Sequence, residues 1–503
     1  MRQTKNRNKR RLRPHSIFWV LFFFLVAGFA HQTFAQELTL DKALEIAFQN
    51  SPSIQAAAYN LNISQHNLAA QQAGLKSQFN LTLTPYQYSN VKVFNELTSK
   101  YNVQELTKSE ARLTITQPII WTDGEIRLTN RFGWQEAASS FTGSIPESTF
   151  NNSLFLTLTQ PLFTYNRKKM QITELELSLE NSQLSYAIQK LQIERSVTQQ
   201  FLSLFYSWRS LEIAEQQLKN ANESYQIIEN KVNAGISAPE ELYQADLTRF
   251  NSQASVQNLK MQYENSQDNF KILLGLPLEN ELIIVTDIRK ALVDVDLSKA
   301  LDHGLEYRME LRQNDIAIQN ALHNLIEAGA INEFKAEVSA TLGLTGTDSG
   351  FGQIYNSPNI DQVVAVSVDI PLFDWGQKKH ILAASQIQVD SQRLSASEEI
   401  KSIKLEIRQA YRSLQNQRTQ IEIAEKNVIN AQRTYDINLE RYKGGDISAY
   451  DMQIYQLQLT QEQLDEVSAL ISYKIALLDL KIRTLWDFEN NLSVIDIKTG
   501  DSK

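Results

Sequence analysis

Two long stretches of the chain, 164–234 and 377–443, contain neither glycine nor proline. Apolar or small residues recur within them at spacings of three and four, for example Leu211, Ala214 and Leu218 in the first stretch. This spacing is a heptad seam, which predicts helices that coil around neighbouring helices. At ~1.5 Å per residue, each helix would be roughly 100 Å long.

The two stretches are copies of each other. Residues 211–225 (LEIAEQQLKNANESY) recur as 421–435 (IEIAEKNVINAQRTY), at an offset of 210 positions. The match continues without a gap from Pro161 to Gly235 in the first copy and from Pro371 to Gly445 in the second. A repeat of this length predicts a fold made of two similar halves in tandem.

The N-terminus has the pattern of a secretory signal peptide. Seven basic residues and no acid precede an apolar run at 17–29, and Thr33-Phe34-Ala35 provides a cleavage site. The alternative, a membrane anchor, is disfavoured because the apolar run is short for a spanning helix. We therefore predict that the signal peptide is 1–35.

Composition excludes several classes of partner and site. Removal of 1–35 takes away seven positive charges and no negative charge, so the formal charge of −8 becomes −15, which argues against nucleic acid as a partner. The absence of cysteine excludes disulfides and thiolate metal sites. No later segment is long and apolar enough to span a bilayer as a helix, so a membrane-embedded form would need a β-barrel.

No motif for catalysis or ligand binding stands out. The six histidines are scattered without metal-site spacing, and there is no Gly-x-Ser-x-Gly sequence. A glycine-rich segment at 343–352 lacks the Lys-Ser/Thr pair of a phosphate-binding loop. We therefore predict a protein that is not an enzyme, with no metal site and no cofactor.

Periodicity divides the mature chain into two structural repeats, 36–289 and 290–489, and a polar tail, 490–503. In each repeat we predict a helix, a strand region, a long helix and a return helix, in that order. For the first repeat these are 38–76, 79–162, 164–233 and 239–274. For the second repeat these are 297–334, 336–371, 376–443 and 448–486.

The strand regions alternate apolar and polar residues, as in Phe79, Leu81 and Leu83. This pattern fits a barrel wall with one apolar and one polar face, and equally a soluble sandwich. Residues 85–107, rich in Tyr, Asn and Ser, are predicted to form strand ends and an exposed loop. Residues 111–135 are predicted to form an extra hairpin around the turn signal Thr122-Asp123-Gly124.

Pro161 and Pro371 each lie between a strand pattern and a long helix. Proline cannot donate to a strand ladder and is tolerated at a helix start, so each is either an ordinary strand terminator or the residue that fixes the strand-to-helix bend. The duplication favours the bend. Gly235 and Gly445 fit the left-handed position that ends a helix, and they predict sharp reversals into the return helices.

Several short segments together resemble the TolC family of bacterial outer-membrane efflux channels. They are the opening at 38–54 (LTLDKALEIAFQNSPSI), the junctions QPLF at 160–163 and IPLFDWG at 370–376, LLGLP at 273–277, and the glycine-centred turns. The resemblance covers 38–489. It implies long antiparallel coiled-coil helices plus a transmembrane β-barrel formed by a homotrimer, to which each subunit gives four strands.

The resemblance also implies a function and partners. The expected function is the exit duct of a tripartite efflux or secretion pump, which conducts substrates passively through the outer membrane of a Gram-negative bacterium. The expected partners are a periplasmic adaptor (membrane fusion) protein, an inner-membrane pump of RND or ABC type, and outer-membrane lipid. Two alternatives, a periplasmic adaptor and a coiled-coil scaffold of the envelope, explain the duplicated halves and the strand regions less well.

In the family, the two helix reversals are the periplasmic tips, where the adaptor docks and the closed channel is constricted. Here they are 232–241 and 442–451. Alignment through Gly445 places Tyr442 on a gating tyrosine and Asp451 on an acidic ring, and alignment through Gly235 places Glu241 on the opposing latch.

One latch residue departs from the family pattern, because Ile447 takes the place of an arginine. An acid in the first turn of a helix is also explained by the helix dipole. Both interpretations of Glu241 and Asp451, a gate and a structural role, therefore remain open at this point.

Overall fold

The computed structural model describes residues 36–494 except 97–98, 140–144, 281 and 285–290. The predicted signal peptide and the last part of the predicted tail, 495–503, lie outside the described residues. The chain forms two compact units, which we call the tip unit and the sheet unit. The tip unit contains the described parts of Met1–Ser51, Ser196–Lys290 and Ala424–Ile471, and the sheet unit those of Pro52–Arg195, Ala291–Ile423 and Ser472–Lys503.

The two long helices are α4 (Arg167–Asn233), of 67 residues, and α8 (Gln377–Gly444), of 68 residues. Helix α4 begins three residues later than predicted because Phe163, with φ 59°, turns the chain before the helix starts. The buried residues of α8 follow the heptad spacing: Ile403, Ile407, Ala410, Leu414, Ile421, Ala424, Ala431 and Tyr435.

The return helices follow the two reversals. Helix α5 spans Pro239–Leu274, and helix α9 spans Ala449–Thr484, two residues shorter than predicted at its C-terminal end. In the tip unit, the amide of Gln456 in α9 donates to the backbone carbonyl of Gln217 in α4 at 3.1 Å, and the Gln244 and Gln453 side chains of α5 and α9 bond at 3.1 Å.

The helix predicted at 38–76 is two helices, α2 (Leu40–Asn50) and α3 (Pro52–Gly74). The break has a local cause, because a residue before proline is pushed out of the helical conformation, and Ser51 has ψ 128°. Upstream, Leu38 is not helical but lies in strand β1 (Gln36–Leu38), which pairs in parallel with β6 (Leu282–Ile284).

The helix predicted at 297–334 is also two helices, α6 (Leu297–Tyr307) and α7 (Met309–Gly329). Between them Arg308 is extended, and its guanidinium lies 2.8 Å from the carboxylates of both Glu310 and Glu406. These ion pairs, one of them to a helix distant in sequence, stabilise the break where no proline is present.

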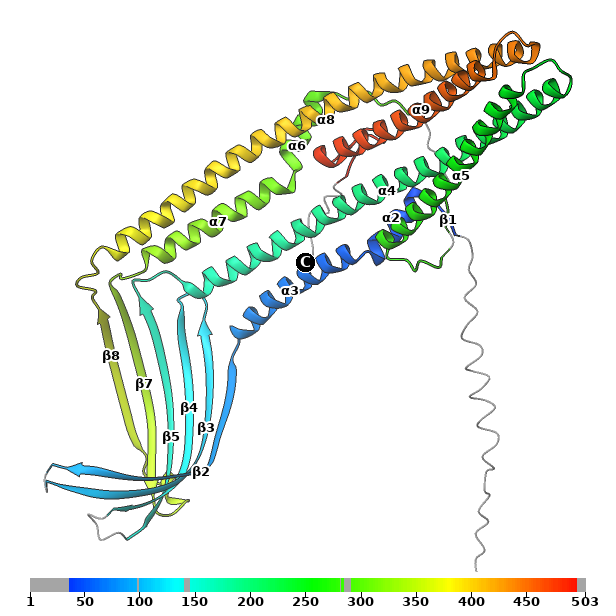
Figure 1. Cartoon of the computed structure of the whole chain (residues 1–503). Helices are drawn as coiled ribbons and strands as arrows, with labels where there is room; N and C mark the ends of the chain where they lie inside the picture. The colour runs from blue at the N-terminus through cyan, green and yellow to red at the C-terminus, as the bar shows by residue number, and fades with distance from the viewer. Residues whose placement is uncertain (1–35, 97–98, 140–144, 281, 285–290, 495–503) are drawn as a thin grey trace, which may run out of the picture. The chain divides into compact units, whose positions relative to one another are not determined.

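The sheet unit contains one six-stranded antiparallel sheet in which each strand pairs with the next along the chain. Helices α3, α4, α7 and α8 all meet the same end of this sheet, which we call the helix side (Figure 1). The strands in order are β2 (Gln78–Asn95), β3 (Lys100–Ile119), β4 (Gly124–Ser139), β5 (Glu147–Leu162), β7 (Lys335–Asp348) and β8 (Asn359–Asp369).

The prediction of strand ends and an exposed loop at 85–107 is wrong in the extent of the loop, because β2 continues to Asn95 and β3 begins at Lys100. Strands β2 and β3 run through that segment, with a register shift between Thr84 and Gln87 around Pro85. Their outer parts extend beyond the rest of the sheet, since the β3–β4 ladder begins only at Gln104, and this end projects from the other strands (Figure 1). The polar composition that suggested a loop thus belongs to strands that are exposed.

The predicted extra hairpin is β3–β4, with its turn at 120–123, so the sheet has six strands where the resemblance implied four. Within the predicted polar tail, Leu492–Ser493 (β10) pairs with Trp486–Asp487 (β9). Among the described residues, none of the helices has an apolar stretch long enough for a membrane crossing.

Candidate functional site at the two helix reversals

The two reversals have the same backbone geometry. Gly235 has φ 71° and Gly445 has φ 91°, so both occupy the left-handed region that favours glycine. Each donates its N–H to the carbonyl three residues earlier, and the following N–H reaches the carbonyl five residues before it, which is the Schellman motif. No atom lies within 4 Å of where a Cβ would be at either position, so the backbone alone requires glycine.

The helices that leave the reversals begin differently. Helix α5 begins at Pro239 after Ala238, which gives no side-chain cap, and Glu241 lies in its first turn. At the start of α9, the Asp451 carboxylate accepts hydrogen bonds from the backbone N–H of Ser448 at 3.2 Å and from the hydroxyl of Ser448 at 2.7 Å. In return, the Ser448 hydroxyl accepts a hydrogen bond from the Asp451 N–H at 3.2 Å. Asp451 therefore has a structural role as half of a capping box.

Tyr442 lies at the centre of the apolar core of the tip unit. It is 1% exposed and packs with Ile228, Tyr435 and Met452. Burial, together with the negative charge of Glu241, raises the pKa of its phenol well above the ordinary range, so it is neutral at physiological pH. Its hydroxyl makes no hydrogen bond to the described residues.

Lys231 holds the two reversals together. Its ammonium donates to the Tyr442 carbonyl at 2.7 Å and lies 5.1 Å from the centre of the Tyr442 ring. The carbonyl belongs to the last turn of α8, where a cation is favoured by the helix dipole. One lysine from α4 thereby contacts both the backbone and the ring of the predicted gating tyrosine.

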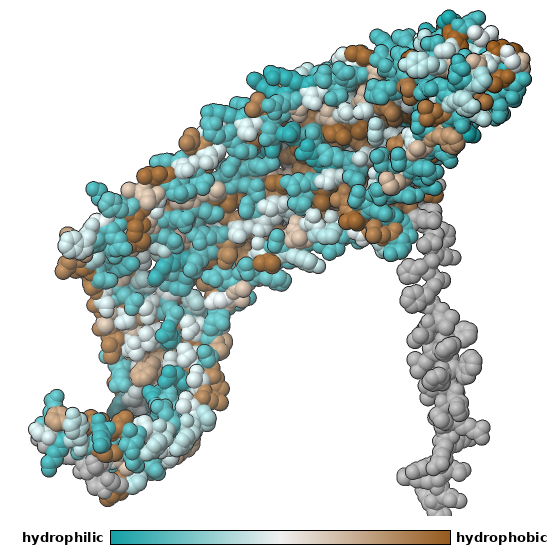
Figure 2. Space-filling view, in the orientation of Figure 1, coloured by the Kyte–Doolittle hydropathy of each residue, from teal (hydrophilic) through white to brown (hydrophobic). Residues whose placement is uncertain are grey.

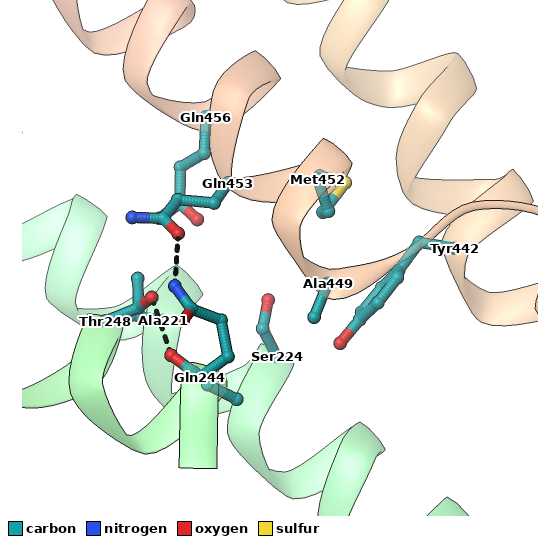
Figure 3. Close-up of a pocket in the computed structure, with 10 residues that line it drawn as sticks. Ala221, Ser224, Gln244, Thr248, Tyr442, Ala449, Met452, Gln453 and Gln456 are labelled. Carbon is teal, nitrogen blue, oxygen red and sulfur yellow. Dashed lines mark hydrogen bonds between the residues drawn. The ribbon is translucent and has the colours of Figure 1, made fainter. Parts of the chain in front are cut away.

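A small pocket of about 20 Å³ lies beside Tyr442, between the hairpins α4–α5 and α8–α9. Figure 3 shows the Tyr442 hydroxyl directed toward Ala449 and Ser224, with the bonded Gln244 and Gln453 pair on the far side. The lining is neutral, and among the described residues no group of His, Cys, Asp or Glu could hold a metal ion.

The structure shows a feature that we missed in the sequence. Three exposed apolar side chains follow one another at i, i+4 and i+7 on each return helix, and we call these the tip stripes. Brown residues gather at the helix reversals in Figure 2. The members are Tyr243, Leu247 and Phe250 on α5, and Tyr450, Ile454 and Leu457 on α9. Their spacing recurs at an offset of 207 positions (450 − 243), three fewer than the offset of the long helices, and was a signal available in the sequence.

Each of the two prolines was predicted to be either a strand terminator or the residue that fixes the strand-to-helix bend. Pro161 is inside β5, opposite Glu337, and Pro371 follows the end of β8. The left-handed residues that turn the chain come later, at Phe163 in the first repeat and at Trp375 and Gly376 in the second.

The comparison with protein families is decisive. The family model "Outer membrane efflux protein" matches residues 125–276 and 305–482, one segment in each repeat. The chain belongs to the outer membrane efflux protein family. Both segments contain a long helix, its glycine reversal and its return helix, so the family match includes both tips.

Individual relatives are distant in sequence but similar in fold. The cation efflux system protein CusC of Escherichia coli K12 is 23% identical over 354 residues, which are 69% of this chain and 73% of CusC. The Campylobacter jejuni CmeC outer membrane channel superposes with a TM-score of 0.66 at 14% identity, over 88% of this chain and 85% of that one. VceC of Vibrio cholerae gives 0.66 at 15% identity, over 88% and 95%.

These findings confirm the family, the TolC-like fold and the function class predicted from the sequence. This outer membrane efflux protein is a channel of tripartite efflux systems in the outer membrane, with a periplasmic helical tunnel, and it transports without catalysing a reaction.

Proposed function

We propose that three copies of this efflux protein form one duct, and that its helix reversals form the periplasmic entrance, where a periplasmic adaptor docks and delivers substrate from an inner-membrane pump of RND or ABC type. The observation that supports this proposal is the pair of tip stripes. Their central members, Leu247 and Ile454, are 54% and 45% exposed in the single chain.

A ring of identical subunits needs two different surfaces on every copy, since each copy contacts its two neighbours through opposite sides. The two return helices supply two such surfaces, one on α5 and one on α9. Apolar residues at i, i+4 and i+7 pack well against a neighbouring helix in a coiled coil. We therefore assign the tip stripes to contacts between copies.

Charge substitutions test the assembly. Leu247→Glu and Ile454→Glu place a charge in each stripe, whereas Gln253→Glu adds the same charge on an exposed position of α5 outside the stripe. We expect the first two to lower the temperature at which the purified trimer dissociates on native gels, and the control to leave it unchanged. An unchanged dissociation temperature in both stripe variants would refute this assignment.

The gate is tested at Glu241 and Asp451. Because Asp451 also caps α9, alanine would remove a cap and a charge together. Asp451→Asn removes the charge while its side-chain oxygen still accepts the hydrogen bond from Ser448. If the tip acids close the duct by charge, Asp451→Asn and Glu241→Gln should admit antibiotic or dye into expressing cells, and Glu440→Gln, beside the reversal, should not. Entry at the unmodified level in both tip variants would leave only the capping role.

A further inference from the structure

We propose that each copy contributes all six strands of its sheet to the shared wall, so that three copies close a barrel of eighteen strands. The proposal rests on the trimer proposed above. It concerns an asymmetry between the repeats, since the first repeat supplies strands β2 to β5 and the second only β7 and β8.

The two additional strands cannot leave the sheet without breaking it. Strand β3 pairs with β2 on one side and, from Gln104 to Ile119, with β4 on the other. Strand β4 pairs in turn with β5 from Glu125 to Ala137. A hairpin that covered the pore as a cap would lie across a sheet, whereas β3–β4 lies within one.

The two faces of the sheet support the same conclusion. One face is free of charge and mainly apolar through the central part of all six strands, as the lipid-facing side of a barrel is. Three uncharged polar residues, Asn130, Asn152 and Gln362, lie among the apolar ones. The face includes Phe79, Leu81, Leu113, Ile115, Ile126, Leu128, Leu154, Leu156, Leu158, Ala340, Leu342, Val364 and Val366, which the pairing registers place together.

Charged residues of β3–β4 lie on the opposite face. Glu110 forms ion pairs with Arg112 at 2.7 Å and with Arg131 at 2.6 Å. Arg112 and Arg131 are directly opposite each other in the ladder, on the face that also carries Thr114, Thr129 and Thr157. The hairpin therefore has its apolar face and its polar face on the same sides of the sheet as the other strands.

The turn of this hairpin also completes the start of a long helix. In the second repeat, the Asp374 carboxylate accepts the backbone N–H groups of Gly376 at 2.9 Å and Lys378 at 3.0 Å, which caps α8. In the first repeat Thr164 occupies the position of Asp374, so the bond that Asp374 makes to Lys378 has no counterpart from this position, while Asn166 accepts the Lys169 N–H at 2.9 Å.

Asp123, from the β3–β4 turn, supplies the missing bond. Its carboxylate accepts the N–H of Lys168, the counterpart of Lys378, at 3.3 Å, and pairs with the side chains of Arg167 at 3.0 Å and Lys168 at 3.1 Å. The Asp123 side chain is only 3% exposed. A turn that shares the capping of α4 with Asn166 is a fixed part of the junction between wall and tunnel.

The edges of the sheet are suited to closure with other copies. Strands β2 and β8 have no partner on their outer sides among the described residues. Lysines on an edge strand commonly prevent edge-to-edge pairing; β8 has none, and the lysine of β2, Lys92, lies in its outer part, away from Leu81. Figure 2 shows hydrophobic residues along both margins of the sheet. Because six is an even number, β8 of one copy and β2 of the next run antiparallel in a ring.

The register gives the tilt of the wall. Following the ladders across the sheet, Gln78 at the helix-side end of β2 is level with Val363 in β8, which continues six residues further to Asp369. A stagger of six residues over five strand-to-strand steps corresponds to a tilt of about 40°, within the range of closed barrels.

Closure restricts the offset between copies to even values, because an odd offset would place the apolar face of β8 beside the polar face of β2. Offsets of six and eight residues per copy give tilts of about 35° and about 43°. With eighteen strands the backbone diameter would be roughly 35 Å, compared with roughly 23 Å for twelve.

Cysteine cross-linking in membranes tests this arrangement, and the chain's lack of cysteine gives a clean background. An offset of six brings Val366 opposite Leu81 of the neighbouring copy, and an offset of eight brings it opposite Leu83. The double variants are Val366→Cys with Leu81→Cys, and Val366→Cys with Leu83→Cys. The matched control, Val366→Cys with Thr82→Cys, represents an odd offset.

On oxidation we expect one of the two even-offset pairs to give covalent trimers on a denaturing gel, and the control to give none. The pair Leu81→Cys and Leu113→Cys should form a disulfide within each chain, since these residues are opposite in β2 and β3. A disulfide in the same chain between Leu81→Cys in β2 and Leu156→Cys in β5 would show that β2 pairs directly with β5, with β3 and β4 outside the wall. The wall would then have twelve strands, and the proposal would be overturned.

The proposal and the trimer can fail separately. A native trimer with the β2–β5 cross-link refutes only the eighteen-strand wall, whereas a protein that is monomeric on native gels refutes the proposed assembly. Electron cryo-microscopy of the unmodified protein, in which the strands are counted directly, decides the matter if a cysteine variant does not fold. Eighteen strands are expected, and twelve would overturn the proposal.

Discussion

Two adjacent glycines at the second helix reversal should respond in opposite directions to the same substitution. Gly444 is the last residue of α8 and is helical, whereas Gly445 has φ 91°. A Cβ on Gly445 meets no atom within 4 Å, and on Gly444 the nearest atom is the Asp446 carboxylate at 3.8 Å, an ordinary contact. Steric clashes with other residues therefore do not enter, and backbone conformation alone decides.

The magnitudes follow from that difference. Alanine in the left-handed region costs about 1–2 kcal/mol, so Gly445→Ala should destabilise the reversal by that amount. In a helix alanine is up to about 1 kcal/mol better than glycine, so Gly444→Ala should be neutral or stabilising. Gly235→Ala, at φ 71° and equally unobstructed, should behave like Gly445→Ala.

Hydrogen exchange with mass spectrometry measures this locally, which suits a large membrane protein whose global unfolding is irreversible. A cost of 1–2 kcal/mol raises the open population about 5–30-fold, so peptides across 436–456 should exchange faster by that factor in Gly445→Ala. Gly444→Ala provides the control. If the two variants exchange equally fast, the positive φ at Gly445 does not explain why glycine is needed there, and loss of flexibility at the turn would explain it instead.

Three further substitutions test contacts within each unit. Tyr442→Phe should leave the tip unit as stable or more stable, because the hydroxyl it removes is buried without a partner. Tyr442→Ala should instead destabilise the tip unit by about 3–5 kcal/mol. An equal rise in hydrogen-exchange rates in both variants would contradict this. Burial alone would raise the pKa of Asp123, but hydrogen bonds from Arg167 and Lys168 lower it. Protection of the amide hydrogens at the start of α4 should therefore persist at neutral pH and disappear only as the pH falls through that lowered pKa. Asp123→Asn should remove this pH dependence from the exchange rates. Glu406→Gln weakens the ion pairs that Glu406 makes with Arg308 and with Arg483, and it should lower the stability of the sheet unit by about 1–3 kcal/mol. This should appear as a lower melting temperature at a fixed scan rate. An unchanged melting temperature would show that other contacts stabilise the break at Arg308.

Sequence reasoning succeeded where a pattern was local and repeated. Heptad spacing and the absence of glycine and proline indicated α4 and α8, and Gly235 and Gly445 located the reversals, because a positive φ favours glycine whatever the surroundings. The break at Ser51 could have been predicted from Pro52. The break at Arg308 could not, since it depends on Glu406, which is distant in the chain.

The strands show a different limit. A strand exposed on both faces has no apolar alternation, so the polar stretch after Pro85 looked like a loop until its pairing with β3 was seen. The role of Asp123 was equally hidden, because a cap supplied by a distant turn leaves no local signature. Asp451 is the converse case: the Ser448 to Asp451 spacing of a capping box is visible in the sequence, but the family resemblance drew attention to a gate.

Single-channel conductance tests the central claim most directly. The detergent-purified trimer is inserted into a planar bilayer and compared with the Glu241→Gln/Asp451→Asn double variant, which removes both charges and keeps the cap of α9. A duct closed at acidic tips predicts small, cation-preferring currents that grow in the variant. A correctly folded trimer that conducts no ions, with or without the substitutions, would contradict the account of this protein as an outer-membrane exit duct.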